Sequence, residues 1–367
     1  MHLQQPPNAM TVDDEFKDLF DGRLKQLFLY VTDECALRCE QCLYKTTLGP
    51  RSLPLQVALW FTQKAYEFGA RKLTYIGGEP SMYGRQFDHE PLYRLIEAAA
   101  SIGYEYIRLD TNGLFSSSFL SDGRIQLLSN MAFSLDGHTA AIHDRLRGQG
   151  TFNKSVRRLS EAVARGLFTT ITTCVHPGNI GSLREMARFA CDIGAKQLNF
   201  HPLFKMGVER DTFTGATDIA PSSWLTAYEH LEGIRKEIGA GLHIRAPRRF
   251  VPVSHYEQSP EAFDYCPTTM GERMLVHPNG DIRICALCIG TPLRVAQWRN
   301  GHVFTETGTH ELADTHRQRR PCMRQTRDFG DLAPLCISFK EGQQEPVWTK
   351  YQFDQSFGER AWKKKLK

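Results

Sequence analysis

Strand-like and helix-like segments alternate through residues 25–205, and this alternation limits the fold more than any other feature of the sequence. In the helix-like segments, apolar residues recur at three- and four-residue spacing. Short connections between successive segments favour a parallel sheet with helical crossovers, either an open barrel or a doubly wound layer. The predicted strands are 27–32, 72–76, 106–110, 131–135, 169–175 and 197–201, and the predicted helices are 54–68, 90–102, 153–164, 182–193 and 222–238.

The rest of the chain carries weaker patterns. Residues 1–24 are predicted to be a polar lead-in, residues 241–265 a linker, and residues 341–367 a tail. Residues 266–340 are rich in cysteine, and Pro278-Asn279-Gly280-Asp281 lies between two apolar runs, which predicts a β-hairpin. We therefore predict an α/β protein with a main unit over residues 25–240 and a small second unit over residues 266–340.

Composition indicates a cytoplasmic globular protein. No apolar run approaches the ~20 residues that span a bilayer, and the amino terminus has no apolar signal core. Ten cysteines in such a chain favour metal ligation over disulfide bonds. The net charge is only +4, and the basic run 363–367 is expected to be a solvated terminus. We therefore expect neither a nucleic-acid partner nor a membrane association.

A polar motif follows each predicted strand. Because the carboxyl ends of parallel strands meet at one edge of a sheet, we expect these motifs to form one active site there. They are the cysteine loop after the first strand, Gly77-Gly78-Glu79-Pro80, Asp110-Thr111-Asn112-Gly113, Ser134-Leu135-Asp136-Gly137, Cys174-Val175-His176 with Asn179, and Asn199, His201 and Pro202.

The cysteine loop has a distinctive spacing. Three residues separate Cys35 from Cys39, and two separate Cys39 from Cys42. Three thiolates on such a loop can bind one face of a cubane iron–sulfur cluster and leave the fourth iron open to a substrate or cofactor. A zinc site or a lone redox cluster is the alternative. Zinc needs a fourth ligand, and no cysteine or histidine lies in the next dozen residues, although a distant one would serve.

With this triplet, the sequence resembles the radical S-adenosylmethionine (SAM) enzymes. The resemblance covers roughly residues 25–205 and implies a partial (β/α)6 TIM-like barrel. It also implies a [4Fe–4S] cluster on Cys35, Cys39 and Cys42, whose open iron binds the amino and carboxylate groups of SAM. One electron then cleaves SAM to a 5′-deoxyadenosyl radical, which abstracts a substrate hydrogen. A reducing partner such as flavodoxin or ferredoxin would supply that electron.

The resemblance also assigns residues around SAM. Gly77, Gly78, Glu79 and Pro80 match the run that holds its α-ammonium group. Asn112 and Ser134 match positions that contact its ribose and carboxylate, and Asp136 faces the substrate side. Turn formation is the alternative role for Asn112 and Asp136, since both stand in turn sequences. The family has an aromatic residue directly before the third cysteine, where this chain has Gln41, so Leu43 or Tyr44 is expected to take over its contact with adenine.

A neighbouring segment offers two arginines. In the run from His143 to Gly148, which resembles a segment of radical SAM proteins with auxiliary clusters, Arg145 and Arg147 are suited to bind a carboxylate. Alternatively, both are surface ion-pair partners of Asp144.

The carboxyl-terminal third resembles the SPASM/twitch type of extension. A full SPASM domain has seven cysteines for two clusters, whereas this chain has five, so the resemblance implies one auxiliary [4Fe–4S] cluster with four of the five as ligands. A structural zinc ribbon is the alternative, because two residues separate one pair of these cysteines. The five are Cys266, Cys285, Cys288, Cys322 and Cys336.

Two enzymatic outcomes remain open. In the first, the auxiliary cluster accepts a second electron, which gives net oxidation of a ribosomal peptide or natural-product intermediate by crosslink, thioether formation or dehydrogenation. In the second, a cysteine returns a hydrogen atom to the substrate radical, as in an epimerase, and Cys336, Cys288 and Cys174 are the candidate donors. The competing class is a non-catalytic electron carrier or a zinc-stabilised binding module.

Overall fold

Seven parallel strands form the centre of the molecule. The computed structural model describes residues 10–45, 47–202, 219, 221–246, 248–252, 271–286, 289, 294–306 and 332–336. Each of the six predicted strands is present within one residue at either end, and a seventh extends the sheet. In sheet order the strands are β2 (Gln26–Thr32), β3 (Lys72–Gly77), β4 (Tyr106–Thr111), β5 (Asn130–Ser134), β6 (Thr169–Val175), β7 (Gln197–Pro202) and β8 (His243–Arg245).

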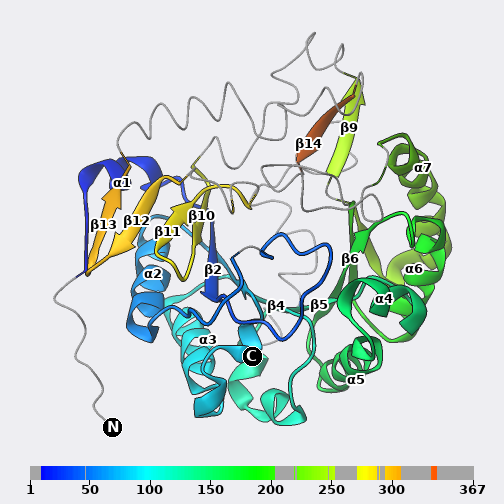
Figure 1. Cartoon of the computed structure of the whole chain (residues 1–367), viewed down its shortest axis with the longest axis horizontal. Helices are drawn as coiled ribbons and strands as arrows, with labels where there is room; N and C mark the ends of the chain where they lie inside the picture. The colour runs from blue at the N-terminus through cyan, green and yellow to red at the C-terminus, as the bar shows by residue number, and fades with distance from the viewer. Residues whose placement is uncertain are drawn as a thin grey trace.

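Helices cover the outer face of this curved sheet, as Figure 1 shows. The five predicted helices are all present, whereas α4 was not predicted. The α-helices that follow β2 in the chain are α2 (Leu55–Glu67), α3 (Glu90–Ile102), α4 (Ala140–Arg147), α5 (Thr151–Ala164), α6 (Leu183–Asp192) and α7 (Pro221–Ile238). Short 3-10 turns lie at Pro80–Met82, Arg85–Phe87, Ser117–Ser121, Gly123–Leu127, Ile180–Ser182 and Gly239–Gly241.

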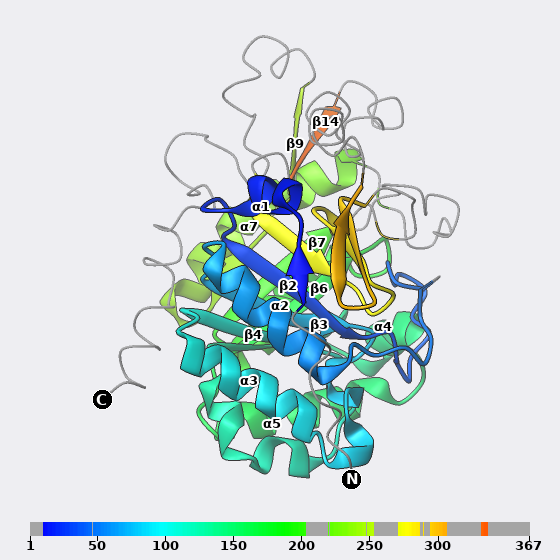
Figure 2. The same ribbon diagram turned by 90° about the vertical axis from the view of Figure 1, so that its left-hand side faces the viewer.

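Alternation along the strands separates the core from the interior of the barrel. Leu27 and Leu29 of β2 are buried in one core cluster with Phe61 of α2, and Figure 2 shows α2 lying across β2 and β3. Residues of opposite parity face away from the helices. On that face, the Asn130 amide donates hydrogen bonds to the Tyr106 and Thr170 hydroxyls, both at 2.8 Å. The helix-facing side is therefore apolar, whereas the inner side is lined by hydrogen-bonded polar groups.

Segments from both ends of the chain extend the sheet beyond β2. The predicted hairpin is confirmed: β10 (Arg273–Val276) and β11 (Asp281–Arg283) are antiparallel, and β10 is parallel to β2. The sheet continues through β12 (Ala296–Arg299) and β13 (His302–Thr305) to β1 (Thr11–Val12), which is parallel to β13. Among the described residues, β1 and β8 are its two edges, so the barrel is open.

Two ranges that were expected to lack structure contain elements. Residues 1–24 include α1 (Asp14–Phe20), whose Phe16 and Phe20 are fully buried, and the Asp13 carboxylate caps this helix and accepts a hydrogen bond from the Thr305 N–H at 2.8 Å. The range 241–265 contains β8 and also β9 (Arg248–Pro252), which is antiparallel to β14 (Leu332–Cys336). No helix in the described part of the chain is long and apolar enough to span a bilayer.

Candidate active site

The cysteine loop leaves the carboxyl end of β2 and is closed at its base. Asp33, directly after β2, accepts a hydrogen bond from the Arg51 side chain at 2.9 Å. The Asp33 N–H donates to the Arg51 carbonyl at 2.8 Å, and its carbonyl accepts from the Gly49 N–H at 3.1 Å. The loop therefore starts and ends at the same point, and Figure 1 shows it crossing in front of the open centre of the sheet.

The three cysteines of this loop are free thiols in a shielded setting. Cys39 is only 8% exposed, and Cys35 and Cys42 are half-buried. Burial raises the pKa of Cys35 and of Cys42 to about 11, and it also raises the pKa of Cys39. The neighbouring sulfurs raise the pKa of Cys42 further, because thiolates repel one another. A cationic centre among them would remove both penalties, which is the setting that iron ligation requires.

The residue types of this loop suit an iron–sulfur cluster. Thiolates are the usual ligands of such clusters, and Cys35, Cys39 and Cys42 supply three of them. In a cubane each thiolate binds a different iron, so its ligands do not need to converge on one point. Cys35, Cys39 and Cys42 are therefore a fitting ligand set for a [4Fe–4S] cluster.

Gly77 and Gly78 bring the end of β3 against the backbone of the cysteine loop. The Gly78 N–H donates to the Thr32 carbonyl at 2.7 Å. A Cβ atom on Gly78 would lie 2.2 Å from the Glu34 carbonyl oxygen, and one on Gly77, whose φ is +137°, would lie 2.3 Å from that of Thr32. Both positions therefore require glycine for close approach to the loop backbone, whereas their expected contact with the α-ammonium group of SAM stays a prediction.

Glu79 joins the ends of β3 and β4. Its carboxylate is 3% exposed and accepts hydrogen bonds from the Thr111 hydroxyl and the Asn112 N–H, both at 2.7 Å, and from the Ser81 N–H at 3.1 Å. Burial raises the pKa of Glu79, and these hydrogen bonds oppose that shift only in part. A carboxylate held only by neutral donors gains from an approaching cation, so its chemistry fits the α-ammonium group of SAM.

Asn112 combines the two roles that the sequence left open. Its side-chain oxygen accepts a hydrogen bond from the Leu114 N–H at 2.8 Å, which forms a turn. Its amide nitrogen lies 3.8 Å from the Cys35 sulfur and donates to it. Asn112 therefore shapes the end of β4 and also reaches the cysteine loop. Ser134 ends β5 and is half-buried.

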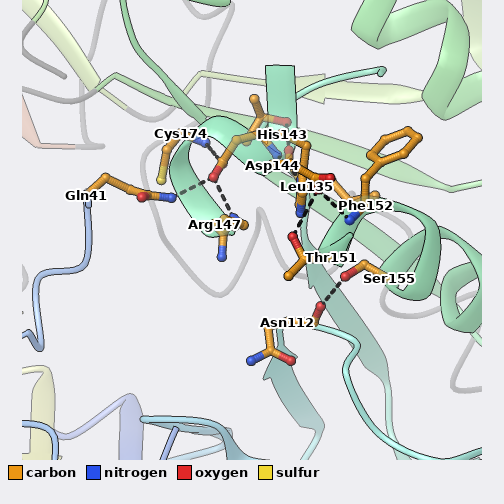
Figure 3. Close-up of polar contacts among 12 residues, drawn as sticks. Gln41, Asn112, Leu135, His143, Asp144, Arg147, Thr151, Phe152, Ser155 and Cys174 are labelled. Atoms are coloured by element: carbon orange, nitrogen blue, oxygen red, sulfur yellow. Dashed lines mark hydrogen bonds and ion pairs between the residues drawn. The ribbon is translucent and has the colours of Figure 1, made fainter. Parts of the chain in front are cut away.

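Asp136 accepts hydrogen bonds from Gln41, Arg147 and Cys174, which are labelled in Figure 3. It is fully buried, two residues beyond β5. One carboxylate oxygen accepts hydrogen bonds from Gln41 at 2.6 Å and from Arg147 at 2.5 Å, and the other accepts from the Cys174 N–H at 2.8 Å. Asp136 therefore links the cysteine loop, α4 and the end of β6.

The two arginines of α4 have different surroundings. Arg147 forms an ion pair with Asp136 and is 11% exposed, whereas Arg145 lies beside His176 and Gly178. The Asp144 carboxylate accepts hydrogen bonds from the N–H groups of Gly150 and Phe152 and from the Thr151 hydroxyl, at the start of α5 (Figure 3). The carboxylate that Arg147 binds is thus Asp136 of its own chain, and Asp144 organises the next helix.

Tyr44 packs toward the carboxyl-terminal hairpin. Its hydroxyl lies 3.3 Å from that of Tyr30 on β2, and the two rings are edge-to-face. The ring of His277 also stacks on the ring of Tyr30, at a centroid distance of 4.0 Å. Leu275 and Ile289 complete this cluster. These aromatic rings connect the cysteine loop to the region of the predicted auxiliary site.

Only part of that auxiliary site lies in the described residues. Cys285 lies two residues after β11, is half-buried and forms no disulfide bond with another described cysteine. Cys336 is the last residue of β14, where the backbone alone is described. Cys266, Cys288 and Cys322 lie outside the described residues, so the auxiliary ligand set stays a prediction.

Sequence reasoning missed the partnership of Gln41 with Asp136 and Arg147. Gln41 was noted only as a departure from an aromatic position, and its amide oxygen is buried without a hydrogen-bond donor among the described residues. Arg147 follows Asp136 by 11 residues, whereas Gln41 precedes it by 95. The sequence did contain one signal for this contact: Gln41 lies in the cysteine loop and Asp136 lies just after a strand, and both were expected at the same edge of the sheet.

Comparisons with known proteins agree with this geometry. Residues 29–190 match the Radical SAM superfamily. The chain is 26% identical over 320 residues to a PqqA peptide cyclase of Ruegeria pomeroyi, covering 82% of this chain and 80% of the relative. It is 24% identical over 341 residues to a GTP 3′,8-cyclase of Haemophilus influenzae, covering 90% of this chain and 93% of that relative.

Solved structures share the fold. Streptococcus suis SuiB bound to S-adenosylmethionine has a TM-score of 0.61 at 14% identity. The match covers 86% of this chain and 70% of the SuiB chain. SuiB bound to the precursor peptide SuiA also gives 0.61 at 14% identity, with 82% and 66% covered. The open parallel barrel is the partial barrel that the sequence predicted, and the matched residues include the cysteine loop, Glu79 and Asp136. The chain therefore contains a radical SAM domain, which spans residues 29–190 and uses a [4Fe–4S] cluster and SAM.

Proposed function

We propose that this radical SAM enzyme carries out an oxidative modification of a ribosomal peptide. When bound, the cluster and SAM supply an adenosyl radical that takes a hydrogen atom from the substrate. Three sets of contacts hold the cysteine loop: its closed base, the Gly77–Gly78 approach and the Asp136 network. The observation that carries the proposal is that three free thiols lie on a loop fixed this firmly at the carboxyl ends of the strands.

The chain's own residues have distinct roles in this proposal. Cys35, Cys39 and Cys42 bind the cluster, and Glu79 accepts the α-ammonium group of SAM. Asn112 and Ser134 contact the rest of SAM from the ends of β4 and β5. The half-buried loop and the fully buried Asp136 exclude water on one side, which protects a reactive intermediate.

A peptide substrate is supported by two relatives. One is a PqqA peptide cyclase, and the other, SuiB, is solved with a precursor peptide. The substrate would lose one hydrogen atom to the radical and then an electron and a proton, and an auxiliary [4Fe–4S] cluster held by four of the five carboxyl-terminal cysteines would supply the acceptor for that electron. A flavodoxin or ferredoxin would deliver the electron that starts each turnover. The similarity to a GTP 3′,8-cyclase keeps a small-molecule substrate as the competing case.

Anaerobic reconstitution tests the chemistry. The full chain, loaded with iron and sulfide and supplied with SAM and dithionite, is expected to form 5′-deoxyadenosine, which chromatography with mass detection measures. Cys39→Ala should abolish it, whereas Cys191→Ala on α6 should not, since Cys191 lies on an outer helix. A fully loaded cluster that yields no 5′-deoxyadenosine would favour the electron-carrier reading.

The same assay separates the substrate classes. A short peptide encoded beside this chain should lose the mass of two hydrogen atoms for each crosslink formed. The peptide assignment would be contradicted if a small molecule increased the release of 5′-deoxyadenosine and no such peptide did so.

A redox-neutral epimerase is the second candidate, and Cys174 is the observation that favours it. Cys174 is a half-buried cysteine outside any disulfide near the end of β6, and its N–H donates a hydrogen bond to Asp136. In deuterated water, an epimerase would place one deuterium at the product carbon. Cys174→Ala would then stall product while SAM is still consumed. Full turnover by Cys174→Ala without deuterium uptake would exclude Cys174 as the donor.

A further inference from the structure

Two consecutive residues of the cysteine loop bind the same structural unit. The Glu40 N–H donates to the Leu146 carbonyl in the last turn of α4 at 3.1 Å. The Gln41 amide donates to Asp136 at 2.6 Å, and it shares that carboxylate oxygen with the Arg147 guanidinium. The middle of the loop is therefore attached to the end of α4 and to Asp136, two residues beyond β5, at once.

The Asp136–Arg147 pair is a rigid anchor for this attachment. Asp136 is fully buried and Arg147 is 11% exposed, so neither charge is readily solvated alone. The second oxygen of Asp136 accepts the Cys174 N–H at 2.8 Å, and its backbone carbonyl accepts from the Asn179 amide at 2.7 Å. These bonds leave the carboxylate little freedom to turn, so the guanidinium that it holds has a fixed position beside Glu40 and Gln41 of the cysteine loop.

We propose that Arg147, held by Asp136 and joined to the loop through Gln41, is a positioning residue that sets the reduction potential of the cluster on this loop. This inference rests on the proposed function, in which Cys39 is a cluster ligand. A cation beside the ligating loop stabilises the reduced cluster, because reduction adds negative charge. Asp136 offsets part of that effect while it fixes the geometry.

The electrostatic account predicts shifts of opposite sign. Arg147→Gln removes the cation and should make the potential more negative. Asp136→Asn keeps the shape of the side chain and removes the compensating charge, so it should make the potential more positive. A purely structural role would loosen the loop in both variants and give no such opposition.

Potentiometric titration of the reconstituted full chain, followed by EPR of the reduced cluster, measures these shifts. We expect about a tenfold change in the reduction equilibrium for each variant, which is ~59 mV for one electron. Arg147→Lys should stay near the wild-type potential because it keeps the charge, and Arg145→Gln on the same helix is the matched control. Shifts of the same sign, or no shift, would overturn the electrostatic role.

A second measurement tests the attachment of the loop and does not require reduction of the cluster. Gln41→Ala should lose iron to a chelator several-fold faster than Arg145→Gln, and amide hydrogen exchange at residues 35–42 should rise only in the former. Equal rates would overturn the role of Gln41. Absence of a cluster signal in the wild type and in Arg145→Gln would refute the proposed function. A normal signal with unshifted potentials would refute this inference alone.

Discussion

Two buried carboxylates flank the cysteine loop, and their surroundings differ. Glu79 accepts hydrogen bonds from the Thr111 hydroxyl and from backbone N–H groups, which carry no net charge. Asp136 is paired with the guanidinium of Arg147. A carboxylate that already has a cation is a structural anchor, whereas one that has only neutral donors is suited to receive a cation from a ligand. We therefore propose that SAM binds on the Glu79 side of the loop and that Asp136 positions the loop on the other side.

The largest expected effect comes from adding a methyl group at Gly78, where the end of β3 packs against the cysteine loop on the Glu79 side. Gly78→Ala would place a methyl group 2.2 Å from the Glu34 carbonyl oxygen, so the end of β3 and the loop must separate. We expect a loss of about 1–3 kcal/mol in the free energy of unfolding, as overpacking typically costs, and failure to retain iron. Chemical denaturation and iron analysis measure both.

The matched control for that variant is Gly49→Ala in the same loop. No atom lies within 4 Å of the position its Cβ would take, so it should unfold and bind iron like the wild type. If Gly78→Ala also behaves like the wild type, the packing account of the Gly77–Gly78 approach is wrong.

The next effect concerns SAM affinity. Glu79→Gln keeps the side-chain shape and removes the charge, so we expect at least about a tenfold weaker Kd for SAM, which is ~1.4 kcal/mol. Burial raises the pKa of Glu79, and an ammonium ligand prefers the ionised form. Wild-type affinity should therefore increase as the pH rises through this pKa, and that dependence should vanish in Glu79→Gln. Calorimetry across pH on the cluster-loaded protein provides the measurement, and an unchanged pH profile in the variant would contradict the assignment.

The smallest effect is a difference in acid sensitivity between the two sides. His143 accepts a hydrogen bond from the Asp136 N–H at 3.2 Å, and burial lowers the pKa of His143 from 6.5 to about 4. The folded protein holds His143 in its neutral form, so above pH 6.5 His143 does not reduce the free energy of unfolding. As the pH decreases from 6.5 toward 4, the free energy of unfolding falls by at most about 1.4 kcal/mol per pH unit. Glu79 behaves oppositely, because its raised pKa makes ionisation costly and acid relieves that cost.

Hydrogen exchange separates these two responses. Between neutral pH and pH 5, and after correction for intrinsic exchange rates, protection at residues 136–147 should fall more than protection at residues 77–82. His143→Gln should remove most of that difference. A uniform loss over both regions would mean that His143 does not control the Asp136 side.

The sequence predicted the elements that depend on local pattern. The six strands of the barrel and the hairpin between β10 and β11 follow from apolar periodicity and a turn sequence, and the cysteine triplet follows from spacing alone. These features need only neighbouring residues.

Contacts between distant segments were beyond that reasoning. The β1–β13 pairing joins Thr11 to His302, and the Gln41–Asp136 bond joins the first loop to the end of β5. Nothing local distinguishes Arg147 from Arg145 as the partner of a buried acid, since that choice depends on how α4 packs. Glu79 was correctly singled out as a carboxylate near the loop, but its neutral donors appear only in three dimensions.

EPR of the reduced cluster with and without SAM tests the central claim most directly. If Cys35, Cys39 and Cys42 leave one iron open, adding SAM to the dithionite-reduced wild-type protein should change the g-values, and Glu79→Gln should need more SAM for the same change. A fully loaded [4Fe–4S] cluster whose spectrum is identical at saturating SAM would contradict it.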